Sequence, residues 1–182
     1  MTCIVGIEHE GRVIIGGDSA GVAGLSISYR SDTKVWADGP WAFGFTSSFR
    51  MGQIIRYAFT PPAIDTWDVD RYMATTFITA LREAIRDNGW MEVNSGRESG
   101  GTFLVGYRDR LYCVQSDFQI GRDLNGYDAV GCGGEIALGS LWTTRSVEPD
   151  PRTRARLALS AAAAHSAGVA APFTIVQTGG AS

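Results

Sequence analysis

After Met1, the chain reads Thr2-Cys3-Ile4-Val5-Gly6-Ile7-Glu8, and after a short polar turn it continues as Arg12-Val13-Ile14-Ile15-Gly16-Gly17-Asp18-Ser19. Both stretches are rich in β-branched apolar residues, and the turn His9-Glu10-Gly11 ends in glycine. This pattern is typical of a β-hairpin. The start of one hairpin strand lies beside the end of the other, so we expect Thr2 and Asp18 at the same end of the pair.

The remaining sequence predicts grouped strands and helices. Apolar segments bounded by turns predict strands at 41–45, 102–107, 111–115, 127–130 and 173–177. Helical periodicity predicts helices at 49–59, 68–88, 133–142 and 153–165. We interpret 94–101 as a loop and expect a mobile tail at 179–182. Hairpins together with grouped helices favour an α+β fold, with antiparallel sheets and helical layers outside. A length of 182 residues fits a single domain over 1–182.

Composition excludes several classes of function. The net charge is −3 and the basic residues are not clustered, so nucleic acid is not an expected partner. There is no apolar run of about 20 residues and no signal-peptide pattern, so we expect no membrane association and a cytoplasmic location. Three cysteines without a CxxC pair and only two histidines argue against disulfides and metal sites. We expect no cofactor.

Thr2 becomes a candidate nucleophile if Met1 is removed. Methionine removal is efficient before a small residue, and it would leave Thr2 with a hydroxyl and a free α-amine. Such an amine has an unperturbed pKa of about 7.7–8, so it can act as the general base for the hydroxyl beside it. Cys3 could serve instead only if both preceding residues were lost, and strand alternation predicts that it is buried.

Asp18 and Lys34 are candidates for the electrostatic support of that nucleophile. The interval from Thr2 to Asp18 is repeated from Asp18 to Lys34. A lysine ammonium held by a carboxylate would lower the pKa of a neighbouring hydroxyl. From spacing alone the alternative stays open that Asp18 caps a strand end and Lys34 is a surface charge.

Five short motifs resemble the proteasome β-subunit family of N-terminal-nucleophile (Ntn) hydrolases, which includes the bacterial HslV peptidase. They are Thr2-Cys3-Ile4-Val5-Gly6, Gly16-Gly17-Asp18-Ser19, Thr33-Lys34-Val35, Gly44-Phe45-Thr46-Ser47-Ser48 and Gly131-Cys132-Gly133-Gly134. The resemblance implies a four-layer αββα sandwich. It also implies that Thr2 is the nucleophile, that Asp18 orients Lys34, and that Lys34 lowers the pKa of the Thr2 hydroxyl.

The resemblance extends to further site residues. It places the backbone N–H of Ser48 as an oxyanion donor, although glycine is usual there. Cys132 stands where a serine supports the terminal amine, and a thiol is a weaker hydrogen-bond partner. Ser166, rather than His165, is the better candidate for the polar group before the last strand. The residues implied to line the specificity pocket are Gly21, Asp32, Trp36, Thr46 and Arg50.

The leading hypothesis is therefore a threonine-type peptidase that assembles into a homo-oligomeric double ring. An AAA+ ATPase unfoldase is a possible partner, and unfolded proteins or peptides are the expected substrates. Two alternatives remain open. The chain could be a catalytically inactive ring or scaffold subunit, or an Ntn amidase or acylase that acts on a small amide.

Overall fold

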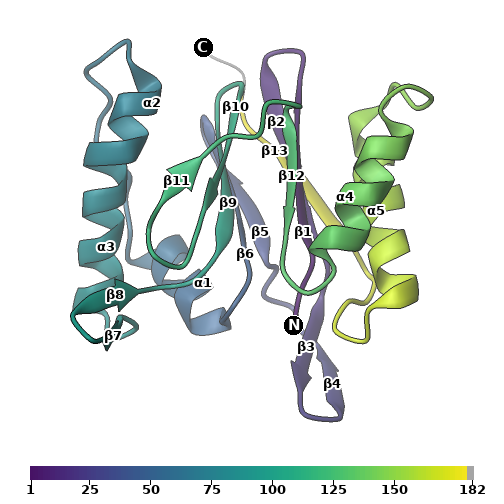
Figure 1. Ribbon diagram of the computed structural model, residues 1–182, viewed down its shortest axis with the longest axis horizontal. Helices are drawn as coiled ribbons and strands as arrows, with labels where there is room; N and C mark the ends of the chain where they lie inside the picture. Colours follow the sequence, from purple (N-terminus) through teal and green to yellow (C-terminus); the bar gives the residue numbers. More distant parts are fainter. Residues whose placement is uncertain (180–182) are drawn as a thin grey trace.

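The computed structural model describes residues 1–179 and consists of four stacked layers (Figure 1). Two antiparallel sheets lie face to face, and helices cover the outer face of each sheet. The first sheet has the order β12-β1-β2-β13 and contains β1 (Ile4–His9), β2 (Arg12–Gly17), β12 (Tyr127–Val130) and β13 (Thr174–Gln177). The second has the order β11-β10-β9-β6-β5 and contains β5 (Val35–Asp38), β6 (Trp41–Phe45), β9 (Phe103–Tyr107), β10 (Arg110–Val114) and β11 (Ile120–Gly121). The predicted αββα sandwich is confirmed.

The β1–β2 hairpin is the element that positions the site. Its strands pair from Ile4 opposite Gly17 to His9 opposite Arg12. Glu10 and Gly11 form the turn with φ angles of 46° and 76°. Two consecutive positive φ angles define a type I′ turn, whose twist matches that of the paired strands. Because of this register, the residue after β2 reaches the residue before β1, and the Asp18 N–H donates to the Cys3 carbonyl at 3.3 Å.

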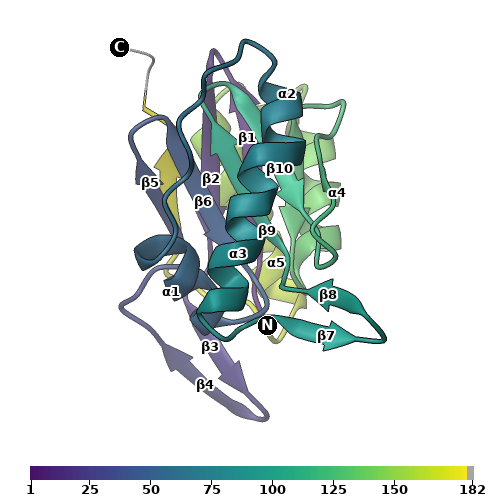
Figure 2. The ribbon, with the colours of Figure 1, turned by 90° about the vertical axis from the view of Figure 1, so that its left-hand side faces the viewer.

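Helices close the two outer layers. On the second sheet lie α1 (Phe49–Tyr57), α2 (Val69–Tyr72), a π-helical segment (Met73–Phe77) and α3 (Ile78–Asp87), and on the first sheet lie α4 (Gly134–Thr144) and α5 (Pro151–His165). Figure 2 views the molecule from the side of α3. Among residues 1–179, no helix is long and apolar enough to cross a membrane.

Three apolar cores hold the layers together. The core between the sheets contains Ile4, Val13, Ile15, Val35, Ala42, Leu104, Leu111, Cys113 and Val130. A second core joins the second sheet to α1 and α3, and a third joins the first sheet to α4 and α5. Burying one large aliphatic side chain stabilises a fold by about 1.5–3 kcal/mol. The hairpin that carries Thr2 and Asp18 is therefore anchored on both of its faces.

The boundaries of several elements differ from expectation. Residues 94–101 are not a simple loop, because β7 (Glu92–Asn94) and β8 (Arg97–Ser99) pair as a hairpin. The last helix begins at Pro151 because the Asp150 side chain accepts from the N–H groups of Arg152 and Thr153 and so caps it. The predicted 68–88 helix is interrupted by the π-helical segment, which its periodicity did not reveal. Of the predicted tail, residues 180–182 lie outside the described residues.

A hairpin that was not predicted extends below the body of the molecule. It consists of β3 (Ala20–Ala23) and β4 (Ser26–Tyr29), which pair with each other and with no strand of the two sheets (Figures 1 and 2). The hairpin follows directly from Asp18 and Ser19. It thus adds a wall beside the Thr2 end of the first sheet.

Candidate active site

Asp18 and Lys34 form a buried ion pair at the end of the β1–β2 hairpin. Lys34 Nζ donates to Asp18 Oδ1 at 2.8 Å, and the two side chains are 1% and 0% exposed. The Asp18 carboxylate also accepts from the backbone N–H groups of Cys3 and Ala20, each at 3.0 Å, and of Ala170 at 3.4 Å. Burial lowers the pKa of Lys34, and the hydrogen bond and charge of Asp18 oppose this change. The pair therefore fixes an ammonium group inside the protein.

Thr2 and the Lys34 ammonium share one hydrogen-bond acceptor. The Thr2 hydroxyl donates to the Met1 carbonyl at 2.5 Å, and Lys34 Nζ donates to the same carbonyl oxygen at 3.4 Å. Both groups thus converge on one oxygen. Thr2 itself is 6% exposed and Met1 is 54% exposed, so Met1 protrudes from the site while the hydroxyl is enclosed. With Met1 attached, the Thr2 nitrogen belongs to a peptide bond and cannot accept a proton.

Two loops from the first helical layer reach the Thr2 nitrogen. The Thr2 N–H donates to Cys132 Sγ at 3.2 Å, and Ser166 Oγ lies 3.5 Å from the same sulfur. Cys132 lies between β12 and α4, and Ser166 is the C-terminal cap of α5. The structure therefore places both of these predicted residues around the position that a free Thr2 amine would take.

The Ser48 N–H, the predicted oxyanion donor, already has a backbone acceptor. It donates to the Thr46 carbonyl at 2.7 Å, while Ser47 takes the left-handed conformation with a φ of 62°. The Ser48 side chain accepts from the Arg50 N–H at 3.0 Å and caps α1. Ser48 could donate to an oxyanion only if its N–H shared or released the Thr46 carbonyl.

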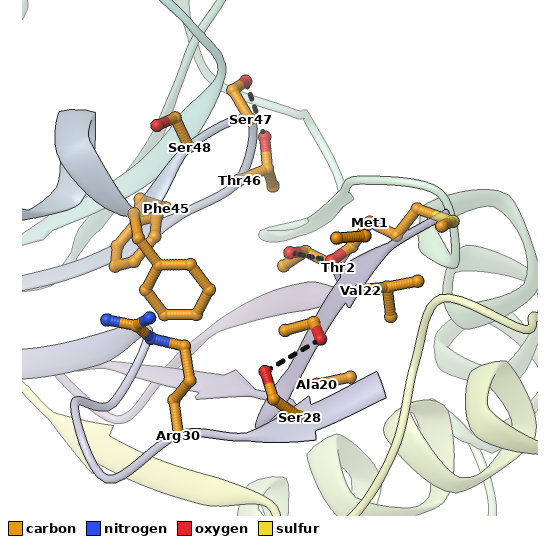
Figure 3. A pocket seen from close by; sticks show the side chains of 13 residues that line it. Met1, Thr2, Ala20, Val22, Ser28, Arg30, Phe45, Thr46, Ser47 and Ser48 are labelled. Carbon is orange, nitrogen blue, oxygen red and sulfur yellow. Dashed lines mark hydrogen bonds between the residues drawn. The ribbon is translucent and has the colours of Figure 1, made fainter. Parts of the chain in front are cut away.

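Thr2 opens onto a pocket of about 250 Å³ (Figure 3). Predicted residues Gly21, Thr46 and Ser48 line it together with Thr2. The other lining residues are Met1, Ala20, Val22, Ala23, Ser28, Arg30, Phe45, Ser47 and Phe49. The pocket is large enough for one side chain of a substrate.

Three predicted pocket residues lie elsewhere. Trp36 is buried among the aromatic residues under α1, because strand alternation turns it to the opposite face of β5 from Val35. Arg50 lies exposed on α1 and donates from Nη2 to the Asn88 carbonyl at 3.3 Å. Asp32 lines a separate small cavity. The predicted placement of these three residues in the Thr2 pocket is therefore wrong, and Asp32 instead pairs with Arg30.

The sequence did not indicate Arg30 or the other hairpin residues that line the pocket, Ala20, Val22, Ala23 and Ser28. Figure 3 shows the Arg30 side chain at one side of the pocket, extending from the end of the hairpin toward Phe45. A signal for this wall existed, because the segment 20–29 carries a central glycine, Gly24, between residues that can alternate in a hairpin. Gly24 has a φ of 58°, as a turn residue of this kind requires.

The other thiols and acids do not form a competing site. Cys3 is 0% exposed and packs toward α4 and α5, and its burial raises the pKa of its thiol to about 12. It is therefore neither accessible nor ionised near neutral pH. Within the described part of the chain, no group of three or more His, Cys, Asp or Glu side chains could hold a metal ion.

Comparisons with known proteins support the fold. No family model and no curated protein matches the chain. The BPH protein of Thiobacillus denitrificans, solved in complex with epoxomicin, is 20% identical with a TM-score of 0.82 over 100% of both chains. HslV of Trypanosoma brucei is 16% identical with a TM-score of 0.70 over 98% of this chain and 99% of its own. An Anbu Gly-1 mutant from Hyphomicrobium sp. strain MC1 is 14% identical with a TM-score of 0.67, over 97% of this chain and 80% of its own.

At these identities the likeness establishes the fold. The chain has the HslV-like, proteasome-type Ntn-hydrolase fold, and the resemblance predicted from its five motifs is confirmed at that level.

Proposed function

We propose that this chain is a threonine-type peptidase whose nucleophile is Thr2 once Met1 has been removed. The observation that carries the proposal is that the Thr2 hydroxyl and the buried Lys34 ammonium both donate to the Met1 carbonyl oxygen. Met1 and Thr2 both line the pocket. Burial lowers the pKa of Lys34, and the hydrogen bond and charge of Asp18 oppose this change and favour the charged ammonium.

The reaction follows from these groups. The free Thr2 amine takes the proton of the Thr2 hydroxyl, and Lys34 stabilises the oxygen as it attacks the substrate carbonyl. The amine then returns the proton to the leaving nitrogen, which breaks the peptide bond and leaves an ester on Thr2. A water molecule activated by the same amine hydrolyses the ester. Ser48 supplies the oxyanion donor if its N–H turns from the Thr46 carbonyl, and such a donor is worth about 10²–10³ in kcat.

The assembly belongs to the same proposal. We infer a homo-oligomeric double ring in the cytoplasm, to which an AAA+ ATPase delivers unfolded chains. What supports it is the fold shared with HslV. The small size of the Thr2 pocket also fits an extended peptide that inserts one side chain at a time. Size-exclusion chromatography with light scattering tests the assembly: a ring is expected, and a monomer of 19.5 kDa would contradict it.

One observation favours the inactive ring or scaffold subunit. The Ser48 N–H is already engaged at 2.7 Å, so the chain as it stands has no free donor at that position. A panel of fluorogenic peptides and small amides separates the three functions. We expect cleavage of peptides, abolished by Thr2→Ala and retained in part by Thr2→Ser. Turnover of small amides alone would favour the amidase, and no turnover of any substrate by Met1-free protein would favour the scaffold.

Epoxomicin is a second probe of the site. It is the ligand of the Thiobacillus denitrificans BPH structure. We expect it to bind the Met1-free protein and to raise its melting temperature, since binding to the folded state stabilises it. Thr2→Ala and the Met1-containing protein should show no shift. An equal shift with Thr2→Ala would place the ligand away from Thr2.

A further inference from the structure

Arg30 forms one wall of the Thr2 pocket and is held there by Asp32. Arg30 Nε donates to Asp32 Oδ1 at 2.7 Å and Nη2 donates to Asp32 Oδ2 at 2.6 Å. The Arg30 guanidinium carbon also lies 4.1 Å from the centre of the Phe49 ring. A bidentate ion pair and an aromatic ring fix the orientation of a planar guanidinium much better than a single contact does. Arg30 is therefore a positioned group, although it is partly exposed.

Asp32 acts on the pocket through Arg30. Asp32 lines a separate cavity with Phe49 and Arg56, while Arg30 lines the Thr2 pocket. Two of the guanidinium's donor nitrogens are used by the Asp32 carboxylate, which also cancels the charge locally. The remaining lining combines apolar side chains, among them Val22, Phe45 and Phe49, with uncharged hydroxyl groups, among them Ser28 and Thr46. Lys34, which donates to the Met1 carbonyl beside this pocket, is 2% exposed and paired with Asp18.

An acidic side chain in this pocket would consequently find the Arg30 charge already paired with Asp32. Its carboxylate would lose hydration and would have to compete with Asp32 for Arg30, whereas an apolar side chain would pack against the rings and small residues. Without Asp32, the same guanidinium would face the pocket with its donors free. Charge-assisted bidentate hydrogen bonds to a carboxylate are among the stronger polar interactions in proteins.

We propose that the Arg30–Asp32 pair sets the substrate specificity of the Thr2 pocket: it keeps the pocket neutral and selects medium apolar side chains, and loss of Asp32 converts the pocket to one that accepts acidic side chains. The inference rests on the proposed peptidase function and names its substrate class. Arg30 is the specificity residue and Asp32 is a positioning residue.

The test compares Met1-free wild type with Asp32→Asn and the double variant Asp32→Asn/Arg30→Gln. Asp38→Asn is the matched control, because it removes one carboxylate from the exposed end of β5, away from the pocket lining. The substrates are two fluorogenic peptides that differ only in leucine or glutamate at the cleavage site. The readout is the ratio of kcat/KM for the glutamate peptide to that for the leucine peptide.

We expect wild type and Asp38→Asn to favour leucine equally. Asp32→Asn should raise the glutamate-to-leucine ratio about 10- to 100-fold, the effect of one charge-assisted pairing, and the gain should shrink at high salt. The double variant should lose the gain. An unchanged ratio in Asp32→Asn that still cleaves the leucine peptide, or a gain that survives Arg30→Gln, would overturn the inference.

A binding measurement separates this inference from the proposed function. Calorimetry measures the affinities of the two product peptides, which end in leucine or glutamate, for the same four proteins. The same shift in preference is expected whether or not the chain turns over substrate. Binding with no shift in preference would overturn the specificity assignment, and a shift without turnover would instead contradict the peptidase.

Discussion

Removing the Asp18 carboxylate should destabilise the protein more than removing the Lys34 ammonium. In Asp18→Asn the Lys34 ammonium stays buried without a charged partner, and its acceptors are the neutral amide oxygen and the Met1 carbonyl at 3.4 Å. The asparagine amide would also turn an N–H₂ group toward backbone N–H groups that now donate to the carboxylate. Leaving one charge of a buried pair without its partner costs about 3–5 kcal/mol.

Lys34→Met leaves fewer buried groups without a partner than Asp18→Asn does. Methionine fills a similar volume without charge, and Asp18 keeps its backbone donors from Cys3, Ala20 and Ala170. A carboxylate that accepts several N–H groups is stabilised in its charged form. We therefore expect a cost of about 1.5–3 kcal/mol, the loss of one hydrogen bond to a charged group.

Urea unfolding followed by tryptophan fluorescence measures both costs, and its pH dependence identifies their origin. The folded-state pKa of Lys34 is lowered by burial, and Asp18→Asn removes the opposing effect. Between that lowered pKa and the unfolded value of about 10.4, the unfolded chain binds more protons, so stability relative to wild type should rise with pH. Lys34→Met should show no such recovery. Equal costs for the two variants, or a deficit in Asp18→Asn that does not change from pH 7 to pH 10, would refute the reasoning.

Two further predictions concern the thiols and the sheet packing. In native protein only the exposed Cys132 should react with a thiol reagent, because burial raises the pKa of the Cys3 and Cys113 thiols to about 12. In denaturant all three cysteines should react. Rapid reaction of a second thiol in native protein would contradict this burial. Gly44→Ala should cost about 1–3 kcal/mol in urea unfolding, because its methyl would lie 2.5 Å from Ile4 Cγ2. Gly139→Ala on α4 is the control, because its methyl would meet nothing within 4 Å, and it should stabilise the protein by up to about 1 kcal/mol. Equal effects of Gly44→Ala and Gly139→Ala on the free energy of unfolding would argue against close packing of the sheets.

Sequence patterns predicted the elements whose signals are local. The β1–β2 hairpin follows from two apolar runs and a glycine turn, and the buried stripe of Met73, Phe77, Leu81 and Ile85 follows from helical periodicity. The same patterns do not encode the π-helical segment, because one extra residue in a turn leaves the apolar spacing nearly unchanged. The pairing of β7 with β8 was missed because its strands are exposed and carry no apolar alternation.

The candidate site was predictable where the backbone register determines it. Thr2, Asp18 and Lys34 lie together because β1 and β2 pair without a bulge and Lys34 directly precedes β5. The residues of the pocket wall were harder to predict from the sequence, because their position depends on the directions of side chains. Family spacing placed Asp32, Trp36 and Arg50 in the pocket, whereas strand alternation, an ion pair and a helix contact turn them elsewhere.

The most direct test of the account joins intact mass to turnover. Preparations that differ in the fraction of chains lacking Met1 are assayed with one fluorogenic peptide ending in leucine before the cleavage site, and the fraction is read from the intact mass. We predict that specific activity is proportional to the Met1-free fraction and reaches zero where Met1 is fully retained, since only a free Thr2 amine can act as base. Equal activity with and without Met1, or no activity in chains that all lack it, would contradict Thr2 as the nucleophile.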